Sequence, residues 1–303
     1  MFDILIKAGC YIAIIILGMV LRAVGFFKEE DFSVLSKIVI KITLPAVIIS
    51  GAAGRELDPA LLTISLLGFG GGVIYMVIGF LLNRRAHKER QAFGILNLPG
   101  YNIGNFALPF TQSFLGATGV LITSIFDIGN AFVCLGGSFG VASAVKDGRG
   151  FDVKRVLWAL SRSVPFLAYV VTVSMNLLHI PIPGFVADCA GIAAQANAFL
   201  AMLMIGVGFK LDLKWEKIGR ILTILLCRYS VAAVLALAYY FLLPFPLEVR
   251  QTLVILAFAP IGSAVPVFTA ELKGDVSLSS AINSICLLCS LVIMIVLISV
   301  MLY

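Results

Sequence analysis

The chain has 303 residues, of which 61% are hydrophobic and only 13% are charged. Its mean hydropathy of +1.08 is far above that of a water-soluble domain and predicts a polytopic membrane protein. The formal net charge of +6 does not indicate nucleic-acid binding, because the basic residues lie mostly in short loops and form no basic domain. These loops leave no room for a soluble catalytic domain, and no GxxxxGK[ST] sequence occurs, so neither an enzyme nor an ATP-driven pump is expected.

Windows of about 20 apolar residues can each cross a hydrocarbon core of about 30 Å. Ten such spans are predicted, at 4–24, 33–53, 59–82, 91–113, 118–145, 155–179, 185–209, 219–243, 248–271 and 276–302. A re-entrant segment around Pro244 and Pro246 is the alternative that would change this count by one.

The loops between these spans differ in charge. Those after the odd-numbered spans carry most of the Lys and Arg, including Lys28, Arg84, Arg85, Lys146, Arg149, Lys210 and Lys214. The opposite side carries only Lys7, Arg55 and Arg250. Because positive loops stay in the cytoplasm, both termini are predicted to lie outside. With no convincing cleavable signal, we expect a multi-pass protein of a bacterial inner membrane.

The ten spans divide into two halves of five, residues 1–150 and 151–303. Five crossings bring the chain to the opposite side, so the second half enters the membrane inverted. Helix-breaking sequences fall in span 4 and span 9, the fourth span of each half. This arrangement predicts an all-α membrane protein with two inverted five-helix repeats, as in many secondary transporters.

The break in span 4 lies within residues 97–110. This segment contains two prolines and two glycines inside a stretch, 91–126, that has no Lys, Arg, Asp or Glu. Proline lacks a backbone donor, so an unbroken helix is not expected here. Freed backbone groups at bilayer depth need protein or water as partners, which makes the break, with Asn102, Asn105 and Pro109, a candidate binding site.

Residues 259–268 repeat this pattern near the other end of the chain, again with two prolines and a glycine. Gly262, Ser263 and Pro266 are the candidate site residues of this second break. A half-helix begins near the second proline of each break, and its positive dipole end favours an anion. The amides and the serine can donate to a carboxylate or accept from a hydroxyl, and the alternative is that they only satisfy the broken backbone.

Polar residues also occur in the spans that follow the breaks. Asp127 follows Pro109 by 18 residues and Asn283 follows Pro266 by 17, so the two are predicted to lie at corresponding depths in spans 5 and 10. A carboxylate near the bilayer centre indicates function, which makes Asp127 the candidate for carrying a coupling proton. The alternative is an internal ion pair with Arg228, which lies at comparable depth in span 8.

No cofactor or metal site is expected. The six cysteines lie in apolar spans without the spacing of a disulfide framework. Cys286 and Cys289 are separated like half of a zinc motif, but they have no second pair and no nearby histidine, so they are predicted to be packing residues.

The motifs at the breaks are similar to those of one family of transporters. Residues 102–109, Asn-Ile-Gly-Asn-Phe-Ala-Leu-Pro, resemble the Asn-x-Gly-(x)4-Pro signature in the fourth helix of the auxin efflux carrier family. Residues 259–268 are similar to the ninth helix of that family, and residues 42–46, Ile-Thr-Leu-Pro-Ala, to its second. The short central loop fits the bacterial branch, which is associated with malonate, malate and other small organic acids.

This resemblance implies a fold shared with bile-acid symporters and sodium/proton antiporters, in which two broken helices cross at Pro109 and Pro266. It also implies a scaffold, formed in part by the second and seventh helices, through which the protein dimerises. Many relatives carry a proline in the seventh helix, whereas residues 197–202 here contain none.

The sequence therefore predicts a secondary transporter that moves a small organic anion by alternating access. Asn102, Asn105, Pro109, Gly262, Ser263, Pro266 and Asn283 form its predicted substrate site. A cation/proton antiporter or sodium-coupled symporter on the same fold is the alternative. A membrane receptor or channel is a weaker third reading, because a continuous pore does not require paired broken helices.

Overall fold

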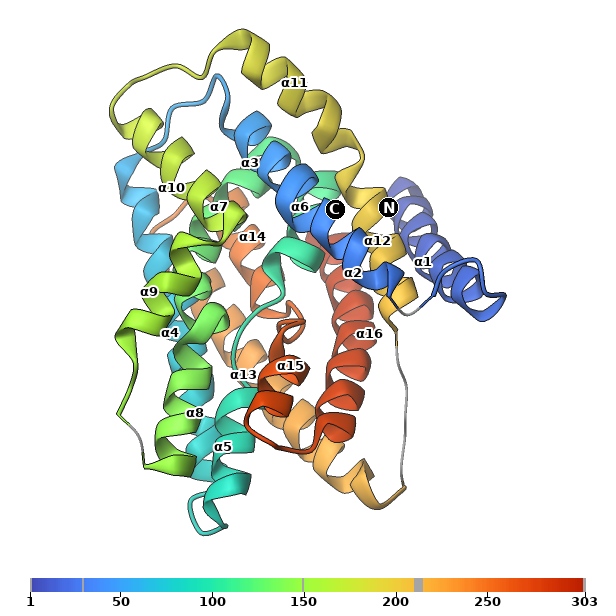
Figure 1. The fold of residues 1–303 in the computed structure, drawn as a ribbon. Coiled ribbons are helices and arrows are strands. Elements are labelled where there is room, and N and C mark those ends of the chain that lie inside the picture. Colours follow the sequence, from blue (N-terminus) through green and yellow to red (C-terminus); the bar gives the residue numbers. More distant parts are fainter. Residues whose placement is uncertain (1, 29, 149, 210–214, 302–303) are drawn as a thin grey trace.

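The fold is taken from a computed structural model that describes residues 2–28, 30–148, 150–209 and 215–301. Arg149, Lys210 and Lys214, which contributed to the predicted orientation, lie outside these ranges. All regular structure within the described ranges is helical (Figure 1). The predicted all-α fold class is therefore confirmed.

The helical elements run from α1 at the N-terminal end to α16 at the C-terminal end. In chain order they are α1 (Phe2–Ala23), α2 (Asp31–Ile38), η1 (Val39–Thr43), α3 (Leu44–Ala52), η2 (Pro59–Thr63), α4 (Ile64–Leu82), α5 (Lys88–Asn97), η3 (Ile103–Ala107), α6 (Leu108–Phe114), α7 (Gly116–Phe132), η4 (Val133–Gly137), α8 (Ser138–Asp147), α9 (Val153–Ser161), α10 (Val164–Leu177), α11 (Gly184–Gln195), α12 (Asn197–Gly208), η5 (Trp215–Lys217), α13 (Ile218–Leu242), α14 (Leu247–Ala257), α15 (Val265–Glu271) and α16 (Val276–Met301). The elements η1, η3 and η4 are π-helical turns, and η2 and η5 are 3-10 turns.

Fewer spans than the predicted ten are found by length and composition. In the described residues, seven helical segments are long and apolar enough to cross a membrane. An eighth is obtained if α9 and α10, which meet at an angle of 76°, form one span. The segments that contain the breaks do not qualify, because each is divided into helices that are too short. The structure thus supports a multi-pass membrane protein with at least seven crossings.

Two groups of helices flank the breaks. One group contains α4, α5, α7, α8 and α13–α16, which contact one another in sequence-distant pairs such as α4 with α7 and α13 with α16. The other contains α1, α2, α3, α11 and α12, which lie along the upper right of Figure 1. Glycine permits the closest approaches: a Cβ on Gly68 of α4 would lie 2.1 Å from Phe126 O of α7. Gly68, which lies in the predicted third span, therefore permits close helix packing.

Proline explains the π-helical turn η3. Pro109 is the second residue of α6. In a regular helix its ring would clash with the carbonyl of Asn105. The preceding turn is wider instead, with Ala107 N donating to Asn102 O at 3.1 Å, an i to i−5 bond. The same pattern precedes Pro45, the second residue of α3, where η1 is also π-helical. Sequence chemistry thus sets the local shape of both segments.

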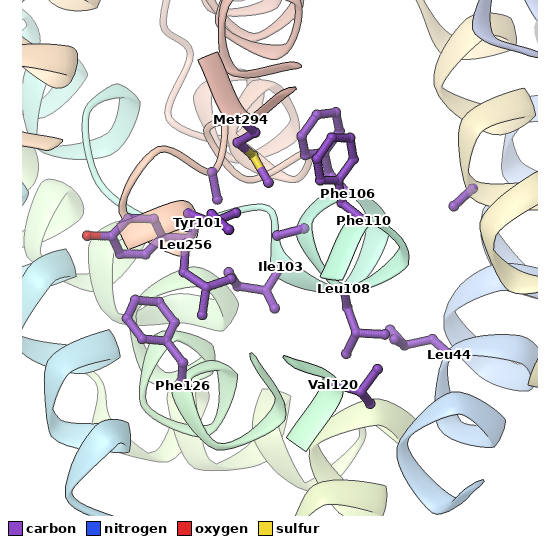
Figure 2. Close-up of a cluster of buried hydrophobic side chains, with 14 of the residues drawn as sticks. Leu44, Tyr101, Ile103, Phe106, Leu108, Phe110, Val120, Phe126, Leu256 and Met294 are labelled. Carbon is purple, nitrogen blue, oxygen red and sulfur yellow. The ribbon is translucent and has the colours of Figure 1, made fainter. Parts of the chain in front are cut away.

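The largest buried cluster surrounds the first break. Figure 2 shows side chains from residues 101–110 meeting others that come from α3, α7, α14 and α16. Phe106 and Phe110 stack with ring centroids 6.2 Å apart and planes 7° apart, and both are fully buried. This packing fixes η3 and α6 against the rest of the molecule, so the residues just before them are held in place.

Candidate functional site

The two broken segments meet in space. Residues 98–102 form the first break, between α5 and η3, and residues 258–264 form the second, between α14 and α15. Asn102 N donates to Pro260 O at 2.8 Å, which joins the two breaks directly. The resemblance implied that the broken helices cross at Pro109 and Pro266. The contact instead lies several residues before each of these prolines. The reason is that these prolines begin the next helices, whereas the free backbone groups precede them.

The first break is held by Asn130, which was not among the predicted site residues. Asn130 of α7 accepts a hydrogen bond from Tyr101 N at 3.0 Å and donates one to Tyr101 O at 2.9 Å. The break also needs Gly100, whose φ of +80° is in the left-handed region. Asn130 is three residues after Asp127 on the same helix, so the two side chains lie on one helix face. This spacing was the sequence signal that could have identified Asn130 as a site residue.

The second break is clamped by Asn283 of α16, whose Nδ2 donates to Gly262 O at 3.0 Å and to Ile261 O at 3.4 Å. Asn283 therefore corresponds in role to Asn130. The sequence paired Asn283 with Asp127 by depth, whereas the residue that bonds the backbone of the first break is Asn130, three residues after Asp127 on α7.

Two cavities are lined by residues at the contact between the breaks. The Arg22 cavity has a volume of about 300 Å³ and is lined by Arg22, Phe32, Asn102, Asn105, Met204, Ile205, Val207, Gly208, Phe209, Ser263, Pro266, Val267, Ser280, Asn283, Ser284 and Leu287. The Asp127 cavity, of about 180 Å³, is lined by Ile40, Leu44, residues 101–105, Asp127, Asn130, Ala131, Cys134, Leu135, Ser163, Pro165, Phe166, Tyr169 and residues 262–265. Among these described lining residues, Arg22 is the one charged group of the first cavity and Asp127 of the second.

Three side chains are shared by both cavities: Asn102, Asn105 and Ser263. Asn105 Nδ2 of η3 donates to Ser263 Oγ of the second break at 3.1 Å, and all three shared residues line both cavities. The Asn105 Oδ1 atom is buried and has no hydrogen-bond partner among the described residues. The predicted site residues are thus brought together except for Pro109, which is buried and does not line either cavity.

Asp127 and Arg228 do not form the ion pair that was the alternative to proton coupling. Asp127 accepts from Asn130 Nδ2 at 2.7 Å and from Tyr169 Oη of α10 at 3.0 Å. Arg228 instead donates to the backbone carbonyls of Leu98, Gly100 and Ala259. Comparable depth in the sequence gave no information about which faces of α7 and α13 these side chains occupy.

A further buried polar network supports the site from α5, α15 and α16. Asn97 donates to Thr269 Oγ1 at 3.2 Å, and its Oδ1 accepts from Ser279 Oγ. The Thr269 hydroxyl lies 2.9 Å from Val265 O and 3.2 Å from Ser279 Oγ, either of which can accept its one proton. The network ties the helix before the first break to the helix after the second. No group of three or more His, Cys, Asp or Glu that could hold a metal is found in the described ranges.

The chain is similar in sequence to known membrane proteins. Residues 10–140, which contain the first break and Asp127, match a family described as "Membrane transport protein". An "Uncharacterized transporter" from Methanothermobacter thermautotrophicus is 24% identical over 271 residues, covering 86% of this chain and 82% of that protein. Both names are those of transporters rather than of enzymes.

The chain is therefore similar to membrane transporters, and its helices are those of a multi-pass membrane protein. The matched family model covers the segment in which the fourth-helix signature of the auxin efflux carrier family lies, which supports the predicted resemblance.

Proposed function

We propose that this protein is a secondary transporter of small organic anions and that the anion binds in the Arg22 cavity. The observation that carries the proposal is the lining of that cavity. Arg22, whose Nη1 also donates to Val207 O and Phe209 O, supplies a positive charge. Asn102, Asn105 and Ser263 supply polar groups at the meeting point of the breaks, and Asn283 lines the same cavity. Hydrogen bonds from such groups to a carboxylate are each worth about 1.5 to 3 kcal/mol. A volume of about 300 Å³ suits a small acid.

The proposal includes ten spans and alternating access. If each broken segment, α5 to α6 and α14 to α15, is a span, the count rises from eight to the predicted ten and the inverted repeat is complete. Residues 1–150 and 151–303 are then the two repeats. Both termini would lie outside in a bacterial inner membrane, and α3 and α11, which pack together, would form part of the dimer surface.

Coupling to protons or sodium is a second candidate function, and one observation favours it. Asp127 is the charged residue of the other cavity and is held by Asn130 and Tyr169 rather than by a cation. A half-buried carboxylate at that depth can carry a proton or attract a cation. The acid and the arginine lie in separate cavities that share Asn105, so an anion and a proton can occupy the protein together.

The test is uptake of radiolabelled malonate and L-malate into proteoliposomes. Asn102→Ala and Asn105→Ala should each weaken substrate affinity by roughly 10- to 100-fold, since about 1.4 kcal/mol is tenfold. Asn83→Ala is the matched control, because Asn83 bonds Gly79 O at the end of α4 and lines neither cavity. If both asparagine variants bind as tightly as the parent, recognition lies elsewhere.

A further inference from the structure

Arg228 is a buried charge whose position was not explained by any predicted role. It lies in the middle of α13 and is 1% exposed, which makes it the largest fully buried side chain among the described residues. An ionised guanidinium away from water is costly unless every donor is satisfied. No carboxylate partner is found for it in the described ranges. Its hydrogen-bond partners are backbone carbonyls.

The three carbonyls come from both breaks. Arg228 Nη1 donates to Leu98 O, and Nη2 donates to Gly100 O at 2.9 Å and to Ala259 O at 2.8 Å. The first two belong to the chain leaving α5 and the third to the chain leaving α14. All three lie just beyond the last residue of a helix, in buried backbone whose carbonyls have no helical partner. One guanidinium therefore satisfies buried carbonyls of both breaks.

Two tyrosines fix the plane of the guanidinium. Its Cζ lies 4.9 Å from the ring centroid of Tyr75 of α4 and 5.5 Å from that of Tyr101 in the first break. The Tyr75 hydroxyl donates back to Arg228 O at 3.1 Å. A planar fork can bond separate acceptors and stack on aromatic rings at once, which the single ammonium of lysine cannot reproduce.

We propose that Arg228 is a positioning residue that fastens the two breaks to each other and to α13. By holding Gly100 and Ala259 with one nitrogen, it keeps the Asn102 to Pro260 contact and the Asn105 and Ser263 side chains in register for the ligand. The inference rests on the proposed function only for its effect on transport. The fastening itself can be measured without a substrate.

Cys134 is a reporter for this fastening. A Cβ built on Gly100 would lie 2.7 Å from Cys134 Sγ, and one built on Gly262 would lie 3.5 Å away, so the thiol touches both breaks. Its Sγ lies 3.2 Å from Asn130 Oδ1 and 3.7 Å from Tyr101 O, either of which can accept its one proton. The thiol lines the Asp127 cavity and is partly exposed. If the breaks separate, it loses the cover that the two breaks provide, and its reaction rate follows the open population.

The experiment uses a full-length chain that keeps Cys134 as its one cysteine, purified in detergent and treated with N-ethylmaleimide. Arg228→Lys should raise the labelling rate by about tenfold, because charge-assisted hydrogen bonds are lost. Arg220→Lys is the matched control on the same helix, where the guanidinium stacks on Phe93, and its rate should not change. An unchanged rate in a well-folded Arg228→Lys protein overturns the proposal.

A second variant covers the case in which Arg228→Lys does not fold. Tyr75→Phe keeps the ring and removes only the bond to Arg228 O, so labelling of Cys134 should rise about threefold. A rate equal to that of the parent overturns the proposal. In proteoliposomes, Arg228→Lys should raise the KM for malonate about tenfold, whereas Arg220→Lys should not. If the parent takes up no malonate, the proposed substrate class fails while the labelling result still decides the role of Arg228.

Discussion

The first break is buried throughout, whereas the second exposes Ser263 and Ala264. The first is clamped at both backbone atoms of Tyr101, followed by a π-helical turn, and packed into the main hydrophobic cluster. The second is clamped only through carbonyls and leads into α15, where Val267 is exposed. Two segments of similar sequence thus differ in how firmly they are held. The first has the features of a fixed wall, and the second those of a more adaptable one.

The largest effect is expected from replacing Asp127. This acid lines the cavity on which the first break borders, and the described lining of the Arg22 cavity contains no acid. If Asp127 carries the coupling proton, Asp127→Asn should abolish accumulation driven by a pH gradient and leave substrate exchange largely intact. Asn283→Ala, next to the second break, should weaken affinity and keep the pH dependence. Uptake in proteoliposomes with and without a pH gradient measures both. Unchanged pH-driven uptake in a folded Asp127→Asn protein would reduce Asp127 to a structural role.

The two clamps should differ in their contribution to stability. Asn130→Ala leaves the buried N–H of Tyr101 without a partner and its carbonyl with only the weak Cys134 thiol donor, which is expected to lower the free energy of unfolding by roughly 2 to 4 kcal/mol. Asn283→Ala removes bonds to carbonyls of a more exposed segment and should lower it by about 1 kcal/mol. Thermal unfolding of the purified variants in one detergent compares them. Equal losses would contradict the difference between the breaks.

The two glycines beside Cys134 offer a smaller and closely matched comparison. Gly100 has a left-handed φ and a Cβ there would meet the thiol, so Gly100→Ala should destabilise the protein by roughly 1 to 2 kcal/mol. Gly262 has neither restriction, since a Cβ there is in ordinary contact, and Gly262→Ala should be close to neutral. The melting temperatures of the two variants check this. A larger loss for Gly262→Ala would refute it.

The smallest effect is expected from removing the charge of Asp275, which lies in the connection between α15 and α16. Burial raises the pKa of Asp275, but hydrogen bonds from Lys217 and Leu278 N outweigh this, so its pKa lies below the usual value. A carboxyl with a lowered folded pKa stabilises above its unfolded pKa of about 3.9, and the contribution is lost as pH falls through the folded value. For a partly exposed pair the effect is below about 1 kcal/mol.

Asp275→Asn keeps an acceptor for Leu278 N and removes the charge paired with Lys217. Its melting temperature should be slightly below that of the parent at neutral pH, and the difference should disappear in acid. The first segment offers the contrast, because it joins α7 through Leu115 and Gly116 without an ion pair. A difference between variant and parent that persists in strong acid would rule out the ion pair as its cause.

Local chemistry made the breaks predictable. Proline and glycine in a charge-free apolar segment leave backbone groups that a membrane cannot satisfy, so both interruptions and the residues beside them followed from the sequence. The gathering of Asn102, Asn105 and Ser263 is also found in the structure. Pro109 lines neither cavity and instead shapes the turn before it.

Tertiary partners were not predictable in the same way. The positions of Asp127 and Arg228 along their spans gave depth but not the direction in which each side chain points, and their pairing was a wrong alternative. Arg22 was not among the predicted site residues, although it lines a cavity whose other walls come from residues far along the chain. Carbonyl partners such as Leu98 O have no signature in the sequence, since every residue carries the same group.

The hydrogen bond between Asn105 and Ser263 has a consequence for molecules that enter from the lipid. A ligand with a carboxylate or hydroxyl can replace this bond with bonds of its own, so it exchanges partners at little net cost. A hydrocarbon chain cannot, and it would leave the buried Asn105 amide without a partner at a cost of about 1 to 3 kcal/mol. A protein surrounded by acyl chains is thereby kept from filling its own site with them, without needing a gate for that purpose.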